Sequence, residues 1–571
     1  MNKPIYALSL ALLFLSACQQ PPETIYADTI LVNGNVYTVD EDNARAEAIA
    51  IKDGRILLVG SNEEVQALQG DSTEVIGLQG QFVMPGFIEG HGHFSGLGQS
   101  LIHLNFLTVQ SWDEIVQMVA QAAEKAKPGE WITGRGWHQE KWLEPLERSV
   151  MGYPYHDQLS EVSPNNPVVL RHASGHSLMA NARAMEIAGI SGETPDPFGG
   201  EIVRDSRGQA IGVFEETAMG LIGTAYEEFR ATLSPEGKKQ EWLRGIGLAS
   251  QECLSKGITS FQDAGSSFEE IDRYAALAES GELGLRLWVM ISGREEGLEK
   301  KAAAFPQVGI GNNFLTVRAI KGYMDGALGA FGAWLLQPYA DKPDSYGKNT
   351  TSIDTLKKWA EIAYDNNLQY CVHAIGDRGN REVLDIFEEQ FQADSSKKGL
   401  RWRVEHAQHL DTTDIPRFKE MEVIASMQGI HCTSDAPFVV RRLGAERARL
   451  GAYPWRSLLD NGVVIANGTD APVEDVDPIE CFYASVTRKR ADTGMEFFPE
   501  QRMTREEAIY SYTLGNAYAA FEEGLKGSLE KGKVADIVVL SNDLSACPDE
   551  EILNTDVLMT MVDGRVKYEK P

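Results

Sequence analysis

The sequence predicts an α/β fold, in which a barrel of eight alternating strands and helices is joined to a small β-domain. Three observations favour this fold class. Apolar, strand-like runs recur through the middle of the chain with helical patterns between them. Both ends of the sequence carry short β-like runs separated by turn residues. Histidine, lysine and aspartate follow the central runs, at the strand ends where such a barrel holds its functional groups.

The first residues have the pattern of an export signal. Lys3 gives a positive start, and the apolar run over 7–15 is shorter than the ~18 residues that a membrane-spanning helix needs. The segment "LSAC", which ends at Cys18, resembles the lipobox of bacterial lipoproteins, whose cysteine carries lipid. We therefore expect a lipoprotein signal peptide over 1–17 and a tether over 18–26.

This interpretation makes the protein an exported, membrane-anchored lipoprotein of the cell envelope. In a Gram-negative cell, Gln19 after the cysteine favours the outer membrane, on its periplasmic side. An ordinary secretory signal with a chance cysteine is the alternative.

The two ends of the remaining chain predict one composite domain. From Ala27 onward, short runs are separated by Asn-Gly and Asp-Gly, which are hairpin signals and predict a small antiparallel unit. A similar pattern returns in "KGKVADIVVL" and "VLMTMVDGRVKYEKP". We expect a β-sandwich built from residues 27–82 and 522–571.

The middle of the chain, residues 83–521, predicts the barrel. The expected strands lie in "QFVMPGFIEGH", "GITSFQDAG", "LGLRLWVMIS", "FLTVRAIKGYMDG", "LQYCVHAIG", "RWRVEHAQH", "VIASMQGIH" and "GVVIANGTDAP". The interval from Gly96 to Lys256 is too long for a single crossover, so we expect an inserted subdomain over about 105–250.

Composition limits the class of partner. The formal net charge is −30, and an acidic surface repels polyphosphate, so nucleic acid is excluded as a partner. A small molecule is the expected substrate, and the sequence leaves the oligomeric state open.

Metal-ligand residue types follow the predicted strands. They are His91 and His93 after the first strand, Lys321 in the fourth, His373 in the fifth, His406 in the sixth and Asp470 after the eighth. Residues two apart on a strand face the same way, so His91 and His93 can point together into the barrel mouth. Imidazole nitrogens and a carboxylate are the ligands that zinc prefers. The sequence predicts a divalent metal site, with zinc the expected ion.

Each of these residues taken alone has a structural alternative. His373 and His406 could be buried, hydrogen-bonded imidazoles, and His409 is a rival ligand to His406. Asp470 could cap a turn, since Asp and Pro are residues that favour turns. The conjunction of ligand-type residues at successive strand ends is what favours the metal site.

The motifs "PGFIEGHGHF", "IKGYMDGALG", "VHAIGDRGN", "RVEHAQH", "NGTDAP" and "GSLEKGKVADIVVL" together resemble the amidohydrolase superfamily. The resemblance runs from Ala27 to the C-terminus, and is strongest to the branch of N-substituted formamide deformylase and exoenzyme-regulator-like proteins. It implies a (β/α)8 TIM barrel that carries one or two divalent metal ions.

The resemblance also implies roles for individual residues. His91 and His93, with Asp470, would bind the more buried metal, and His373 and His406 would bind a second. Lys321 stands where this branch has a metal-bridging lysine carboxylated on its side-chain nitrogen; without that modification a single-metal site is the alternative.

The implied reaction is hydrolysis of a non-peptide carbon–nitrogen bond, in an amide, formamide or cyclic amide, by metal-activated hydroxide. Asp470 would carry the proton, while His431 and His176 would contact the substrate. Two departures affect the site: Glu89-Gly90 replaces the usual Asp before the first His-x-His, and "MQGIH" lacks the usual proline before His431. The alternatives are an amidohydrolase-type deaminase and a non-catalytic metal- or ligand-binding lipoprotein.

Overall fold

The computed structural model describes residues 25–40, 42, 44–107, 109–139, 142–143 and 146–571. The predicted signal peptide, Cys18 and most of the predicted tether lie outside the described residues.

The predicted barrel is confirmed in its α/β class and its parallel sheet. Each predicted run contributes one strand to a nearly closed sheet with neighbour order β22-β21-β20-β19-β18-β16-β15-β8. Neighbouring strands are hydrogen-bonded in parallel. The bounds are β8 (Phe87–Gly92), β15 (Ile258–Ser266), β16 (Arg286–Ser292), β18 (Leu315–Tyr323), β19 (Gln369–Ala374), β20 (Arg403–His406), β21 (Ile424–Gln428) and β22 (Ile465–Gly468).

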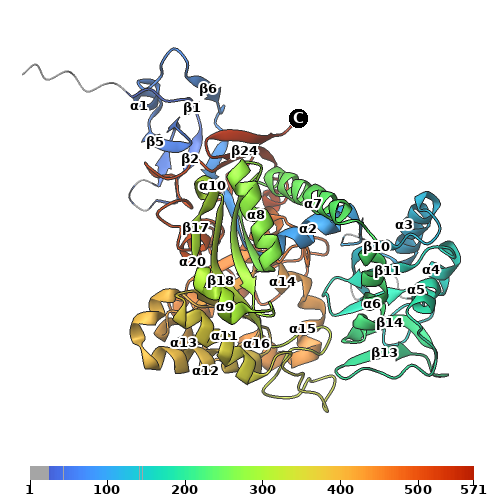
Figure 1. Cartoon of the computed structure of the whole chain (residues 1–571). Helices are drawn as coiled ribbons and strands as arrows, with labels where there is room; N and C mark the ends of the chain where they lie inside the picture. The colour runs from blue at the N-terminus through green and yellow to red at the C-terminus, as the bar shows by residue number, and fades with distance from the viewer. Residues whose placement is uncertain (1–24, 41, 43, 108, 140–141, 144–145) are drawn as a thin grey trace, which may run out of the picture.

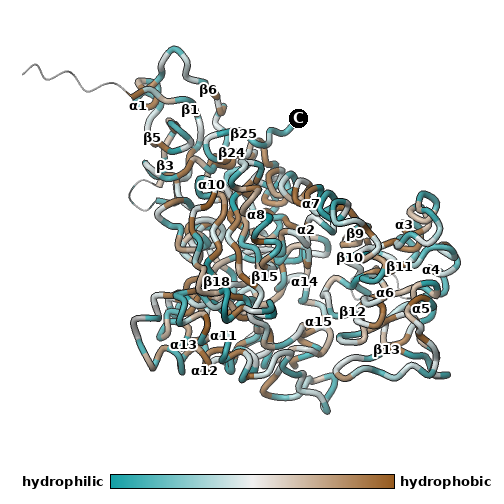
Figure 2. Tube along the Cα trace, viewed as in Figure 1, coloured by the Kyte–Doolittle hydropathy of each residue, from teal (hydrophilic) through white to brown (hydrophobic). Residues whose placement is uncertain are grey.

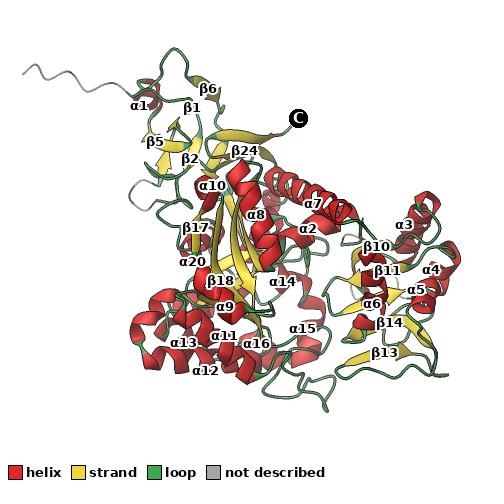
Figure 3. Cartoon of the chain, in the orientation of Figure 1, coloured by secondary structure: helices red, strands yellow, loops and turns green. Residues whose placement is uncertain are grey.

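Helices surround this sheet (Figure 3). They are α2 (Phe94–Ile102), α7 (Pro235–Ser255), α8 (Phe268–Ser280), α11 (Ile353–Asp365), α12 (Asp377–Ala393), α13 (Ile415–Glu420), α14 (Gly429–Ser434), α15 (Ala436–Leu443), α16 (Ala445–Gly451), α17 (Trp455–Asp460), α18 (Pro478–Thr487), α19 (Arg505–Tyr512) and α20 (Leu514–Ala519). Hydrophilic and hydrophobic residues alternate along outer helices such as α8 and α11 (Figure 2). This alternation is what a helix with one face on the sheet requires.

Strands β8 and β22 meet at a seam that side chains hold together. The Asn516 amide nitrogen donates to the carbonyl oxygens of Ile88 and Asn467, at 2.6 and 2.7 Å. The backbone N–H of Asp470 donates to the His91 carbonyl at 2.8 Å. A Cβ at Gly90 would lie 2.4 Å from the Asn467 carbonyl oxygen, so only glycine permits this approach. The seam places the end of β8 against the residues that follow β22.

Strands from both ends of the chain lie above the barrel (Figure 1). One sheet has the order β5-β4-β1-β6 and the other β25-β24-β23-β7-β2-β3. Their bounds are β1 (Thr29–Val32), β2 (Asn35–Tyr37), β3 (Arg45–Ala46), β4 (Ala48–Lys52), β5 (Arg55–Gly60), β6 (Glu74–Gly77), β7 (Phe82–Pro85), β23 (Ile537–Leu540), β24 (Val557–Val562) and β25 (Arg565–Glu569). A short α1 (Asn62–Gln66) joins β5 to β6, and α21 (Asp549–Ile552) lies between β23 and β24.

Two details of these sheets differ from expectation. The N-terminal unit is mixed, since β1 pairs with β6, and β2 with β7, in parallel. The first predicted barrel strand is divided at Gly86 into β7, which belongs to the terminal sheet, and β8, which belongs to the barrel. The hydrophobic pattern could not show this division, because both halves are buried.

A fourth sheet is inserted between β8 and β15, with the order β13-β14-β12-β11-β10-β9. Its elements are β9 (Leu104–Asn105), α3 (Trp112–Lys125), β10 (Ile132–Trp137), α4 (Asp157–Val162), β11 (Val168–His172), β12 (Ser177–Ala180), α5 (Ala182–Ile187), β13 (Gly200–Arg204), β14 (Ala210–Glu216) and α6 (Met219–Ala231). It has its own apolar core around Trp137. Figure 1 shows it beside the barrel.

The remaining short elements belong to the barrel loops. They are α9 (Leu298–Lys301), β17 (Gln307–Gly309) and α10 (Ile310–Asn313). Among the residues the structure describes, no helix is long and apolar enough to cross a membrane.

Replacing Asn516 with Ala is expected to destabilise the barrel by about 2–4 kcal/mol, because the Ile88 and Asn467 carbonyls lose their buried donor. Thermal unfolding checks this, with Asn554→Ala, an exposed position, as control. Equal melting temperatures for the two variants would contradict a structural role for the seam.

Candidate metal centre

A cavity of about 990 Å³ opens at the carboxyl ends of the barrel strands, and the inserted sheet forms part of its wall. Its lining includes His93, His176, Lys321, His373, His406, His431 and Asp470. The fold therefore brings the residues predicted from separate strands to one place, with His91 buried directly beside them.

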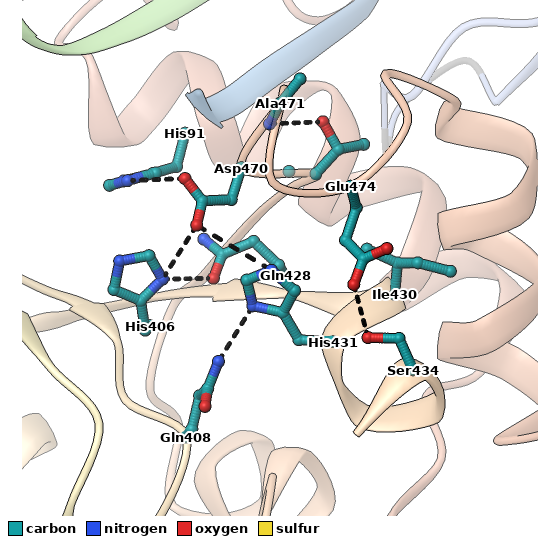
Figure 4. A network of polar contacts seen from close by, with 12 residues as sticks. His91, His406, Gln408, Gln428, Ile430, His431, Ser434, Asp470, Ala471 and Glu474 are labelled. Carbon is teal, nitrogen blue, oxygen red and sulfur yellow. Dashed lines mark hydrogen bonds and ion pairs between the residues drawn. The ribbon is translucent and has the colours of Figure 1, made fainter. Parts of the chain in front are cut away.

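Asp470 joins two groups of potential ligands. Its Oδ1 lies 3.6 Å from His91 Nε2 and 3.2 Å from His93 Nε2. Its Oδ2 lies 3.9 Å from both His406 Nδ1 and His431 Nε2. In each group the candidate ligand atoms lie within 4.8 Å of one another. Figure 4 shows the Asp470 carboxylate pointing between His91, His406 and His431.

Neighbouring side chains determine which nitrogen each imidazole offers. Glu405 Oε2 accepts from His91 Nδ1 at 2.5 Å, which leaves the His91 Nε2 lone pair facing Asp470 and Lys321. Gln428 Oε1 likewise accepts from His406 Nδ1 at 2.8 Å (Figure 4), so the lone pair of His406 is on Nε2.

The hydrogen bond to His431 selects the opposite tautomer. The Gln408 amide nitrogen donates to His431 Nδ1 at 2.9 Å (Figure 4), so His431 Nε2 carries the proton. A protonated ring nitrogen cannot bind a metal, but it can donate to a substrate oxygen. This orientation favours the predicted substrate-contacting role over a ligand role.

His373 and Lys321 complete the cavity floor. The His373 ring lies 4.5 Å from the His406 ring, and its Nε2 lies 3.7 Å from an Asp325 carboxylate oxygen. Lys321 Nζ lies 3.2 Å from His91 Nε2. His373 belongs to neither group around Asp470, so its role as a ligand stays a prediction.

Burial and charge set the protonation states. Burial lowers the pKa of His91 to about 4, which keeps the ring neutral, as metal binding requires. Burial also lowers the pKa of Lys321. Burial alone would raise the pKa of Asp470, but His93, His406 and His91 outweigh it and hold that pKa well below its usual value. The carboxylate is therefore ionised at neutral pH.

A buried ionic network lies behind His91, and the sequence pattern did not predict it. Arg403 Nε lies 2.7 Å from Glu405 Oε1, and a second guanidinium nitrogen donates to the Gly90 carbonyl at 2.8 Å. Burial would raise the pKa of Glu405, yet Arg403 and His91 hold it well below its usual value. An arginine and a glutamate within the apolar run "RWRVEHAQH" were the available signal.

Three other polar residues have plainer surroundings. His409 is buried against the Tyr453 ring and belongs to neither ligand group, so the rival-ligand interpretation has no geometric support. Asp377 accepts from the Leu336 backbone and holds a loop. His176 Nδ1 faces both Glu216 oxygens, at 3.1 and 3.2 Å.

The residues present fit a metal. Among the described residues, His373 Nε2 is a buried polar atom without a hydrogen bond. Such atoms are costly to bury unless a ligand satisfies them. Imidazole nitrogens around an ionised carboxylate form a donor set typical of zinc and related ions.

The sequence profile of the amidohydrolase family matches residues 74–568. The chain belongs to this family. Protein LONG AFTER FAR-RED 3 of Arabidopsis thaliana is 32% identical over 560 residues, covering 96% of this chain and 93% of that protein. N-substituted formamide deformylase of Arthrobacter pascens is 28% identical over 554 residues, covering 95% and 98%.

A crystal structure of an uncharacterized metal-dependent hydrolase from Pyrococcus horikoshii OT3 superposes with a TM-score of 0.72 at 25% identity, covering 91% of this chain and 99% of that one. With the family match, this supports a metal-dependent hydrolase that acts on carbon–nitrogen bonds.

Replacing Glu405 with Gln is expected to weaken zinc binding by about 10–100-fold, because the partner that orients His91 loses its charge. Chelator competition measures this affinity, and Glu279→Gln on the exposed face of α8 is the control. Unchanged zinc affinity in a folded Glu405→Gln protein would show that His91 is not a ligand.

Proposed function

We propose that the protein hydrolyses a non-peptide carbon–nitrogen bond, in an amide, formamide or cyclic amide, with zinc as its metal. The observation that carries the proposal is the Asp470 carboxylate, which lies 3.6 Å from His91 Nε2 and 3.2 Å from His93 Nε2 inside one large cavity. The similarity to N-substituted formamide deformylase supports the choice of bond.

Each residue has a defined task. A bound divalent cation lowers the pKa of water and polarises a carbonyl oxygen. His91, His93 and Asp470 would hold such an ion, and His373 and His406 a second. Asp470 accepts the proton that the attacking water releases and returns it to the leaving nitrogen. His431 donates from Nε2 to the substrate carbonyl oxygen, and His176 contacts the substrate from the inserted sheet.

Lys321 is proposed to be carboxylated on Nζ. Its amine lies 3.2 Å from His91 Nε2 and also lines the cavity. An amine offers a metal one nitrogen, whereas a carbamate offers two anionic oxygens that can bridge two ions. Elemental analysis of protein made with zinc and bicarbonate should give near two zinc per chain, and Lys321→Met near one. Equal metal content in the wild type and in Lys321→Met would contradict a carboxylated Lys321 that bridges two ions.

Asp470→Asn is expected to lower kcat by at least about 10²-fold, because the amide cannot accept a proton. The assay is hydrolysis of a panel of N-formyl and N-acyl amines, with the melting temperature as a control for folding. Turnover retained by Asp470→Asn would show that Asp470 is not the proton acceptor. A wild-type protein that binds zinc but hydrolyses no member of the panel would favour the binding-protein alternative.

We further propose that Cys18 carries lipid and anchors the exported protein to a membrane. The support is the "LSAC" motif after the apolar run over 7–15. Cys18→Ser should move the protein from the detergent phase to the aqueous phase on extraction of expressing cells. Continued partition into detergent would contradict the anchor.

A further inference from the structure

Arg135 of the inserted sheet bonds to two loops that carry proposed functional residues. Its Nε donates to the Pro472 carbonyl at 3.2 Å, and its Nη2 donates to the Ala173 carbonyl at 3.0 Å. Pro472 is two residues after Asp470, and Ala173 is three residues before His176. One guanidinium therefore spans the gap between the barrel and the insertion.

The local backbone is built to aim this side chain. The pairing of β10 with β11 shifts register between Arg135 and Trp137, as at a β-bulge. Gly136 has φ +105°, and a Cβ there would lie 2.8 Å from the Leu107 nitrogen. A residue with a side chain would be strained at this φ, so glycine permits the irregularity. Bulges of this kind re-aim side chains and are frequent next to active sites.

Carbonyl oxygens accept the hydrogen bonds of this cation, and the Asp470 carboxylate attracts it from farther away. Among the described residues, no carboxylate lies within ion-pair distance of Arg135, which donates to the Pro472 and Ala173 carbonyls. Burial lowers its pKa to about 10, so it stays charged at neutral pH. A partly buried charge without a paired acid is costly. Such costs are tolerated where function needs them.

The barrel holds the other side of the Asp470 loop. The Asp470 N–H donates to the His91 carbonyl at 2.8 Å, and the His93 N–H donates to the Ala471 carbonyl at 2.7 Å. The loop is thus fixed by β8 on one side and by Arg135 on the other. Removing Arg135 would free one side without touching a candidate ligand.

We propose that Arg135 is a positioning residue that fixes the Asp470 loop against the His176 loop and so makes the insertion part of the active site. The kinetic consequence rests on the proposed hydrolase function, whereas the structural consequence does not.

The test compares Arg135→Met and Arg135→Lys with Arg171→Met. Arg171 is the exposed residue paired with Arg135 in register on β11. Both Arg135 variants should lose about 10–100-fold in kcat, because small displacements of reacting groups are costly. KM should change by less than about threefold. In Arg135→Met, hydrogen exchange at the Val473 amide, which bonds to Asp470 in this loop, should accelerate. Arg171→Met should change none of these.

Either of two results with a folded Arg135→Met protein overturns the proposal. One is unchanged Val473 exchange in Arg135→Met, which needs no substrate. The other is an Arg135→Met kcat equal to that of Arg171→Met. If Arg135→Met does not fold, guanidinium ions added to Arg135→Ala provide a second test: restored turnover supports the proposal, and no restoration overturns it. A wild-type protein without turnover on any amide would instead count against the proposed function.

The charges that line the cavity carry a second, independent inference. The acids there have partners: Glu216 faces His176, Asp470 faces His93, Asp325 accepts from backbone N–H groups, Asp435 accepts from Tyr453, and Glu474 accepts from Ser434. Arg442 pairs with Asp341. Among the described residues, Arg294 and Lys348 line the same cavity without a carboxylate in ion-pair distance. Both cations are exposed at the cavity wall, where an anionic group of a substrate can reach them.

Arg294 lies beside the end of β18, and Lys348 belongs to a loop that is hydrogen-bonded to the residue after β18. The Arg294 guanidinium lies 4.5 Å over the Tyr323 ring, which is 6.3 Å from the His373 ring. Lys348 contacts the Gly199 carbonyl at 3.4 Å. Its loop is joined to the end of β18, because the Thr350 N–H donates to the Met324 carbonyl.

We infer that Arg294 and Lys348 bind a carboxylate of the substrate, which makes N-acyl or N-formyl amino acids the substrate class. This rests on the proposed function. The probes are N-formylphenylalanine and N-formylphenethylamine, which differ by one carboxylate. The wild type should prefer the acid by about tenfold or more in kcat/KM, since charge-assisted hydrogen bonds are strong. Arg294→Met should remove the preference by raising KM for the acid alone.

Arg449→Met, at an exposed position on α16, is the control and should keep the preference. Faster hydrolysis of the uncharged amide, or an acid preference that survives Arg294→Met, overturns the carboxylate site. If neither formamide is hydrolysed although other amides are, the substrate class is wrong. If no amide is hydrolysed, the proposed function itself fails.

Discussion

The close approach of β8 to β22 is the constraint on which the metal centre depends. These strands are far apart in sequence, and their separation sets the distance from His91 and His93 to Asp470. Three features hold them: the Asn516 amide between their carbonyls, the absence of a side chain at Gly90, and the Glu89 carboxylate that accepts from the Thr469 N–H at 2.6 Å. Because Thr469 immediately precedes Asp470, the seam also orients the carboxylate.

The barrel interior is unusually polar behind the cavity, and this polarity serves the site. Arg403 and Glu405 are fully buried, and removing either partner of such a pair is strongly destabilising. An apolar pair would fill the space at less cost, but it could not hold His91 Nδ1 or bond to the Gly90 carbonyl. The network connects the seam to a ligand, so stability and ligand orientation depend on the same residues.

The inserted sheet contributes side chains to the cavity as well as covering the barrel mouth. It contributes His176 with its partner Glu216 to the cavity, and Glu216 adopts a left-handed φ of +48° that a non-glycine residue adopts only at a cost. Arg135 ties the same sheet to the loop after β22. We therefore regard the cavity as shared between two units, which allows the insertion to alter substrate choice while the barrel keeps its chemistry.

The sequence by itself determined the alternation of strands and helices, the strand ends that carry His91, His93, Lys321, His373, His406 and Asp470, and the family, because hydrophobic periodicity and short motifs are local properties. The division of β7 from β8, the parallel pairings of the terminal sheets and the tautomers set by Glu405, Gln428 and Gln408 were decided only by tertiary structure. Each depends on which distant residue lies opposite, and Arg135 reaches Pro472 across 337 positions of sequence that carry no local signal of the contact.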